Sequence, residues 1–422
     1  MTTTPQPRSS KTRLLFVNRS YWPDAEATGQ LLTDLCESLA DRFDVSVLCG
    51  QPNSNPTGCD YVAQGIQVRN RVRIIRLQHT QFAKRKSWGR MANLLSFTHA
   101  TKRWLRRSTK DKNESFDLLI AESDPFLLPL VVGPHCQATG VKYVAYLQDI
   151  YPDIAIRLGK AKDGWFTRHL RRRLRSAYES AAKVVVLSDA MKQELIDWGV
   201  RPDALAIVPN WVDCQSVRPI KTDNAFRIAN RWTGGCFVVM HSGNMGLSQK
   251  LCALIRAVDE PAFPAHAKLV LIGGGADEPR LRALASSAKR SRDIEFLPYQ
   301  PRESLAESLS AADLQVVSID PRIGGTLMPS KLYGILASGT PVLVIAEPAS
   351  DTAKIVEENE LGIVAGHHEP KLIAEAIAEF AGRDTSALQR MQQNARQLAE
   401  TRYDRSICIK QFADLLQTLH AS

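Results

Sequence analysis

The feature that most constrains the fold is an alternation of short apolar runs with stretches of helical length. In the first half, apolar runs occupy residues 12–18, 45–49, 72–77, 117–121, 141–147, 183–188 and 206–209. In the second half they occupy 237–241, 268–272, 294–297, 314–319 and 342–345, and helical stretches such as 177–182, 190–198 and 251–258 lie between runs. Strands buried on both faces are continuously apolar, so the pattern predicts an α/β fold with doubly wound parallel sheets.

A polar stretch near residues 209–225 interrupts this alternation and indicates a domain boundary. We therefore predict two Rossmann-like domains, 1–212 and 213–400. The last segment, 401–422, is expected to be a helix that packs back toward the N-terminal domain. In folds of this class a small molecule binds outside the carboxyl ends of the strands, and we expect that site in a cleft between the domains.

The excess of positive over negative charge is confined to the first half. Residues 1–210 contain 31 Lys and Arg against 20 Asp and Glu, whereas residues 211–422 contain 23 against 24. An anionic lipid surface, a nucleic acid or an anionic substrate would each match this excess.

Composition excludes several classes of protein. There is no run of about 18 apolar residues, so no transmembrane helix is predicted. Residues 1–11 lack the apolar segment of a secretory signal. The eight cysteines are scattered without a C-x-x-C pair, which favours reduced cytosolic thiols and no metal site.

Residues 328–343 have the pattern of a helix start, a short apolar helix and a stop. Ser330 is expected to cap the helix, and Gly339 to adopt the left-handed conformation that ends it. Between two strands, such a unit directs backbone N–H groups at one point and suits a phosphate. Lys331 adds a positive charge there. An ordinary βαβ unit without a ligand is the alternative.

Two glycine-rich turns follow strands of the second domain. Gly243 and Gly246 come after the run 237–241, with Lys250 shortly beyond, and 273–275 are three consecutive glycines. Glycine lets the backbone approach a ligand closely, although a purely structural turn would also need it.

Carboxylates end two strands of the first domain. Asp149 follows the run 141–147, and Glu122 and Asp124 follow 117–121. Residues at the carboxyl ends of parallel strands face the ligand site, so Asp149 is the preferred candidate. Asp153 lies further along and is an alternative helix cap.

Two basic stretches contain aromatic residues. The first covers residues 84–90 with 102–107 and the second covers residues 165–175; the candidate contacts are Trp88, Arg90, Trp104, Arg171, Arg172 and Arg173. This composition is typical of a helix lying on anionic lipid. A solvated basic face is the alternative, and nucleic-acid binding is disfavoured because no recognised module accompanies the charge.

Together, the segments 21–35, 148–153, 208–211, 242–246 and 329–341 resemble GT-B glycosyltransferases of family 4. The resemblance covers nearly the whole chain. It is closest to the bacterial branch that assembles O-antigen and exopolysaccharide, including N-acetyl-L-fucosamine transferases and colanic-acid enzymes.

The resemblance implies a retaining, metal-independent hexosyl- or N-acetylhexosaminyltransferase. It would use a nucleotide-sugar substrate, with a UDP-sugar expected, and no cofactor. Its acceptor would be a saccharide on a polyprenyl diphosphate, at the cytoplasmic face of the plasma membrane and in surface polysaccharide synthesis. A GT-B-fold UDP-sugar 2-epimerase and a non-catalytic scaffold that binds lipid or nucleic acid are the alternatives.

The resemblance also implies roles for individual residues. Asp149 and Lys331 are the catalytic candidates, and Gly29, Asp149 and Asp153 would lie on the acceptor side. The donor-binding candidates are Gly243, Asn244, Gly246, Lys250, Gly274, Gly275, Tyr299, Thr326, Ser330 and Lys331. The sequence departs from the family at the two usual glutamates, where it has Thr326 and Gly334, and at the usual phosphate-binding arginine, where it has Asn244.

Overall fold

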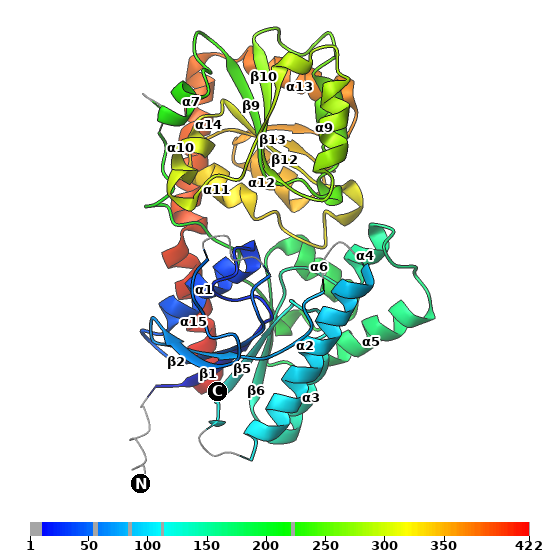
Figure 1. Cartoon of the computed structure of the whole chain (residues 1–422), viewed down its shortest axis with the longest axis vertical. Coiled ribbons are helices and arrows are strands. Elements are labelled where there is room, and N and C mark those ends of the chain that lie inside the picture. The colour runs from blue at the N-terminus through cyan, green and yellow to red at the C-terminus, as the bar shows by residue number, and fades with distance from the viewer. Residues whose placement is uncertain (1–10, 54–57, 83–86, 111–113, 221–223, 422) are drawn as a thin grey trace. The chain divides into compact units, whose positions relative to one another are not determined.

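The structure, a computed structural model, describes residues 11–53, 58–82, 87–110, 114–220 and 224–421 (Figure 1). The chain divides into two compact units, and each is considered by itself. Unit 1 comprises Met1–Val208 with Ile409–Ser422, and unit 2 comprises Pro209–Cys408. Each unit contains a sheet of mainly parallel strands with helices between them, which confirms the predicted fold class.

The sheet of unit 1 has the strand order β3-β4-β2-β1-β5-β6-β7-β8. Its strands are β1 (Arg13–Val17), β2 (Asp44–Cys49), β3 (Gly65–Arg69), β4 (Val72–Arg76), β5 (Leu118–Glu122), β6 (Lys142–Tyr146), β7 (Lys183–Val186) and β8 (Leu205–Ile207). All neighbours pair in parallel except β3, which is antiparallel to β4. Strand β3 was not predicted, because this exposed edge strand alternates apolar with polar residues and has no continuous apolar run.

The helices of unit 1 are α1 (Ala27–Leu39), α2 (Ser87–Ser108), α3 (Pro129–Thr139), α4 (Asp153–Arg157), α5 (Trp165–Glu179), α6 (Asp189–Asp197) and most of α15 (Arg405–Ala421). Helix α3 packs against both α2 and α5, so these three lie side by side (Figure 1). The predicted helix 190–198 corresponds to α6. The helix predicted over 177–182 is wrong beyond Glu179, where α5 ends and the chain turns into β7.

Helix α15, the last in the chain, belongs to the core of unit 1. The Phe412 ring lies 6.4 Å from the ring of Phe16 on β1 and 5.1 Å from that of Tyr146 on β6, centroid to centroid. The Lys142 amine donates a hydrogen bond to the Leu419 carbonyl at 2.7 Å. The end of the chain therefore completes the first unit.

The sheet of unit 2 has the order β11-β10-β9-β12-β13-β14 and is parallel throughout. Its strands are β9 (Phe237–Asn244), β10 (Ala267–Gly274), β11 (Ile294–Leu297), β12 (Leu314–Ser318), β13 (Val342–Ile345) and β14 (Gly362–Ala365). This is the doubly wound order 3-2-1-4-5-6. The order in which successive strands are added across the sheet reverses between β9 and β12. Val239 packs in one core cluster and Val238 and Met240 in another, so β9 is apolar on both faces.

The helices of unit 2 are α7 (Ala225–Ala229), α8 (Cys252–Ala257), α9 (Glu278–Ser286), α10 (Leu305–Ser310), α11 (Lys331–Ala337), α12 (Asp351–Glu358), α13 (Pro370–Ala381) and α14 (Thr385–Leu398). Gly339 ends α11 with φ +60°, as predicted. The predicted cap at Ser330 is wrong. Its backbone is already helical, with φ −60° and ψ −26°, so its side chain makes no capping hydrogen bond.

Within the part of the chain that is described, no helix combines the length and the apolar character needed to cross a membrane.

Candidate functional site

In unit 2, the order of the strands reverses beside β9, and the two glycine turns meet at the carboxyl end of β9. The register of β9 and β10 places Gly243 beside Gly273 and Asn244 beside Gly274. A Cβ atom on Gly273 would lie 2.2 Å from the Gly243 carbonyl oxygen, and φ at Gly273 is +123°. Only glycine fits there, because any side chain would separate the strands where they end.

Tyr299 lies against this glycine pair. Its hydroxyl donates a hydrogen bond to the Gly274 carbonyl at 3.1 Å, and 60% of the residue remains exposed. Gly275 is in tight contact as well, because a Cβ there would lie 2.5 Å from the Asn244 Oδ1 atom. The structure therefore brings together Asn244, Gly274, Gly275 and Tyr299, four of the predicted donor-binding residues.

Lys331 extends from α11 to the same strand ends. Its Nζ atom lies 3.0 Å from His241 Nε2 and would be 3.6 Å from a Cβ placed on Gly243. Burial lowers the pKa of Lys331 from 10.5 to about 7. The residue as a whole is only partly buried, so the amine lies deep beside Gly243 while another part of the residue reaches the surface.

The sequence analysis missed His241, the partner of Lys331. This histidine on β9 is fully buried, and one ring nitrogen lies 3.4 Å from the Asn244 carbonyl oxygen. Burial and the nearby Lys331 amine hold the pKa of His241 well below its usual 6.5, so the ring is neutral. A histidine at the end of the run 237–241, two residues before Gly243, was the available signal.

Lys250, by contrast, has a carboxylate partner. Its Nζ lies 3.5 Å from Asp320 Oδ2, and the same carboxylate accepts hydrogen bonds from the Arg322 guanidinium. The Lys250 charge is thus partly compensated within the protein.

Three further positions named in the sequence analysis pack against other residues of the protein. Thr326 and Gly334 lie in the loop and helix that precede Gly339, and Gly246 lies in the turn after β9. Thr326 is fully buried, and its hydroxyl donates to the Ile323 carbonyl at 2.8 Å rather than facing outward. Gly334 packs toward Leu309, whose Cδ1 would lie 3.3 Å from an added Cβ. Gly246 is held by Gln249, whose Oε1 accepts from the Gly246 N–H at 2.9 Å.

In unit 1, polar residues gather where the strand order reverses between β1 and β5. Arg19, after β1, pairs with Asp124, after β5, at 3.0 Å, and Ser20 donates to the same carboxylate at 2.9 Å. Asn53 donates to Ser20 Oγ at 3.1 Å, and its backbone N–H donates to Asp24. The sequence analysis missed Arg19 and Ser20, although both directly follow the first predicted strand.

Asp149 lies next to this cluster. Ser123 donates a hydrogen bond to Asp149 Oδ1 at 3.0 Å. Burial raises the pKa of Asp149 from 3.8 to about 7, with a smaller contribution from Asp124, while the Ser123 hydrogen bond opposes the change. Burial likewise raises the pKa of Glu122, which accepts from Gln148 at 3.0 Å. Asp149 therefore changes protonation near neutral pH, as a proton acceptor requires.

The structure changes the interpretation of two residues expected on the acceptor side. Gly29 lies in the first turn of α1 and packs on Asp24, whose Cβ would lie 3.1 Å from an added Cβ. Asp153 is the first residue of α4 and does not cap it. Its carboxylate instead pairs with Arg171 at 2.8 Å, because α5 packs alongside.

Comparison with known proteins agrees with this fold. HepE of Anabaena, in a crystal structure with UDP, superposes with a TM-score of 0.71 at 17% identity, covering 96% of this chain and all of that one. Residues 27–211 match the glycosyl transferase 4-like domain, and residues 225–398 match glycosyl transferases group 1. The two matches together cover most of the chain, which therefore consists of two glycosyltransferase domains in the GT-B fold.

Two curated relatives match this glycosyltransferase over most of its length. WbjE of Pseudomonas aeruginosa, named as a glycosyltransferase, is 26% identical over 307 residues, 72% of this chain and 75% of WbjE. WcaI of Escherichia coli (strain K12), named as a colanic acid biosynthesis glycosyl transferase, is 25% identical over 283 residues, 65% of this chain and 67% of WcaI.

The basic stretches of the glycosyltransferase form two exposed helix faces. On α2, Trp88, Met91 and Leu95 are 46–59% exposed. Further along the same helix a groove is lined by His99, Lys102, Arg103, Arg106, Arg107 and Lys110. On α5, Trp165 and Phe166 are 76% and 68% exposed.

Two of the predicted membrane contacts are engaged within the protein. Arg171 pairs with Asp153, and its guanidinium lies 5.6 Å from the Trp198 ring centroid. Trp104 is partly buried, with its ring 6.4 Å from that of Phe116. Arg90, Arg172 and Arg173 are exposed, as is Trp88.

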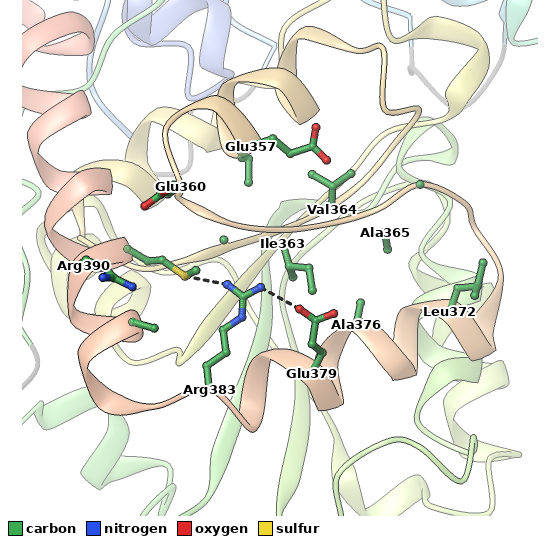
Figure 2. A pocket seen from close by; sticks show the side chains of 15 residues that line it. Glu357, Glu360, Ile363, Val364, Ala365, Leu372, Ala376, Glu379, Arg383 and Arg390 are labelled. Carbon is green, nitrogen blue, oxygen red and sulfur yellow. Dashed lines mark hydrogen bonds and ion pairs between the residues drawn. The ribbon is translucent and has the colours of Figure 1, made fainter.

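A cavity of about 770 Å³ lies elsewhere in unit 2, against the edge strand β14 (Figure 2). Figure 2 shows Arg383 directed toward Glu379, with which it pairs at 2.9 Å. None of the predicted donor-binding residues lines this cavity. Among the described residues, no group of three or more His, Cys, Asp or Glu side chains is placed to hold a metal ion.

Proposed function

We propose that this glycosyltransferase moves a sugar, with retention of configuration, from a UDP-sugar to a saccharide on a polyprenyl diphosphate in surface polysaccharide synthesis. The observation that carries the donor assignment is the buried Lys331 amine beside Gly243. It lies at the reversal point of a doubly wound sheet, where such folds bind nucleotides. The name of WcaI, for colanic acid biosynthesis, and the UDP bound to HepE support the substrate classes.

In this proposal the diphosphate binds against the turn from Gly243 to Gly246 and beside Lys331. The nucleoside lies near Gly274, Gly275 and the exposed ring of Tyr299. Transfer requires that the departing diphosphate be stabilised as its negative charge grows. Lys331 and the backbone of the glycine turn supply that stabilisation without a bound metal ion.

Asp149 is the proposed proton acceptor on the acceptor side. A carboxylate that titrates near neutral pH both accepts a proton from a hydroxyl and releases it afterwards. Ser123 holds one carboxylate oxygen at 3.0 Å, which fixes the orientation of the group.

We further propose that the exposed faces of α2 and α5 lie on the anionic inner face of the plasma membrane, where the lipid-linked acceptor is located. Exposed Trp, Phe, Met and Leu side chains beside Arg and Lys are the composition that binds such a surface. Within α5, the contacts are Trp165, Phe166, Arg172 and Arg173.

The direct test is a thermal-shift panel of UDP-, GDP-, dTDP- and ADP-sugars, followed by transfer to a polyprenyl-diphosphate sugar. A ligand at about a hundred times its Kd adds about 2.7 kcal/mol of stability, a shift of several degrees. We expect UDP-sugars alone to give it. Turnover of a UDP-sugar without acceptor would indicate a 2-epimerase, and no shift with any nucleotide would favour a non-catalytic scaffold.

Replacing Lys331 by alanine tests the donor site. Lys331→Ala should make the free energy of UDP-sugar binding less favourable by about 2 kcal/mol, because it removes a charge-assisted contact. The rate of transfer should fall by at least the factor by which the affinity falls. Circular dichroism should be unchanged because no core packing is lost. Lys371→Met, at an exposed site on α13, is the matched control. Wild-type donor affinity in Lys331→Ala would refute the phosphate assignment.

A further inference from the structure

Lys331 and His241 form a pair that is unlike the other lysine contact at this end of the sheet. Lys250 has Asp320 as its partner, with Nζ 3.5 Å from the carboxylate. Lys331 instead contacts a neutral imidazole, 3.0 Å from Nε2 and 3.4 Å from Nδ1. A neutral partner leaves the charge of an ammonium uncompensated.

The groups around the pair do not supply that compensation. His241 makes its other contacts with the backbone at Asn244 and Val316. Asp320, beyond β12, is engaged by Lys250 and Arg322. On α14, Arg396 donates to the carbonyls of Val217, Ala337 and Cys214. No charged group of a described residue contributes to the lowered pKa of Lys331, and burial alone accounts for it.

We propose that Lys331 is a neutral amine in the empty enzyme, held in place by His241, and that it takes up one proton from solution when the diphosphate of the donor binds. The amine gains a proton and becomes an ammonium, and no bond of the donor is made or broken. The inference rests on the proposed donor site. It adds that the enzyme takes up one proton when the donor binds there. His241 is a positioning residue, since it contacts the amine and not the substrate.

The chemical reason is the balance between desolvation and charge. A buried ammonium without an anion is unfavourable, so the empty site holds the amine in its neutral form near pH 7 and above. A diphosphate carries negative charge to within hydrogen-bonding distance and reverses that preference. Because the bound enzyme holds a proton that the free enzyme lacks, donor affinity must fall as pH rises above the pKa of the free amine, which is about 7.

The test uses the full chain labelled with ¹³C at lysine Cε and titrated by NMR from pH 6 to 9. Without ligand, we expect one lysine signal, absent in Lys331→Met, to titrate near pH 7. With saturating nucleotide-sugar, chosen from UDP-glucose, GDP-mannose, dTDP-glucose and ADP-glucose by binding, the signal should remain that of an ammonium to about pH 9. A free-enzyme signal that titrates above pH 9 would overturn the inference.

Affinity measurements provide the second readout. The Kd of the wild-type enzyme should rise about tenfold between pH 7.5 and 8.5, because the free amine is already mostly neutral there and must take its proton from a solution that becomes tenfold poorer in protons. Lys331→Arg should bind with little pH dependence, since a guanidinium stays charged. Lys371→Met is the control and should behave as the wild type.

Substitution of His241 tests its role as a positioning residue. His241→Leu should lower the pH at which the Lys331 signal titrates, and His241→Gln, which keeps a hydrogen-bond acceptor, should restore most of it. A purely structural histidine would leave that midpoint unchanged in both variants. Donor binding that is tight but independent of pH would refute this inference alone, whereas failure of all four nucleotide-sugars to bind would refute the proposed function with it.

Discussion

At the scale of single residues, the environment of a side chain determines its chemistry in this enzyme. Asp149 and Asp124 both follow strands of the same sheet. Asp124 is paired with Arg19, whereas Asp149 accepts a hydrogen bond from Ser123 and is enclosed by surrounding protein. The result is a carboxyl group whose pKa lies near 7, suited to accepting a proton at physiological pH.

Replacing Asp149 by asparagine should therefore change both activity and the pH dependence of stability. The pKa of Asp149 is raised in the folded state, so the carboxyl group destabilises the fold progressively as pH rises from about 4 to about 7. Asp149→Asn removes that effect. Its free energy of unfolding relative to the wild type should be about 1 kcal/mol higher at pH 8 than at pH 5.5, after allowance for solvent near this partly exposed residue.

Urea unfolding at the two pH values measures the stability, and transfer should fall about a hundredfold as for loss of a general base. Asp203→Asn, an exposed carboxylate beside Arg201, serves as the control with no such pH dependence. An equal change of stability at both pH values would contradict the raised pKa, and unchanged transfer would remove Asp149 from the reaction.

At the scale of elements, packing divides one basic helix into structural and exposed charges. Three consecutive arginines on α5 have the same sequence context, but successive residues of a helix point in different directions. Arg171 faces α4 and pairs with Asp153, while Arg172 and Arg173 face outward.

We expect these arginines to differ in binding to vesicles that contain phosphatidylglycerol. Arg172→Gln with Arg173→Gln should weaken sedimentation with the vesicles by roughly tenfold or more at low salt, since each charge near an anionic surface contributes about 1 kcal/mol. Arg171→Gln should leave vesicle binding unchanged and lower the free energy of unfolding by no more than about 1 kcal/mol. No loss in either variant would support a merely solvated face, and an equal loss in both would show that Arg171 also contacts the vesicle.

At the scale of the whole molecule, segments from opposite parts of the sequence fold together in unit 1. Unit 1 contains the first 208 residues and the last 14, so its core is complete only after unit 2 has been synthesised. Phe412 is fully buried between β1 and β6, and Leu416 lies one turn further along α15, also fully buried.

Phe412→Ala should therefore destabilise unit 1, by about 3 to 5 kcal/mol, because it leaves a cavity in the core. Hydrogen exchange should rise in residues 13–17 and 142–146 and remain slow in residues 237–244. Thr418→Ala, on the exposed face of α15, should leave exchange in all three segments unchanged. Faster exchange in residues 237–244 would show that the units do not unfold separately.

The amount that could be predicted from the sequence differs between elements. Strands buried on both faces, such as β9 and β10, were recognisable because each contains an unbroken apolar run, 237–240 in β9 and 269–272 in β10. The edge strands β3 and β14 were not, since β3 is exposed and β14 has only four residues, one of them glycine. The glycine turns after β9 and β10 and the helix end at Gly339 could be predicted from the sequence, because a positive φ or a close backbone contact depends on the glycine residue itself.

The sequence by itself determined the fold class, the two-domain order and the glycine turns, because periodicity and backbone freedom are local properties. Tertiary structure decided which charges are compensated. Lys331 and His241 are 90 residues apart, and nothing in either segment indicates the other. The cap predicted at Ser330, beside Lys331, was wrong for the same reason, because α11 begins without a capping hydrogen bond from that side chain. Protonation depends on burial and on neighbours, and only the folded chain brings those neighbours together.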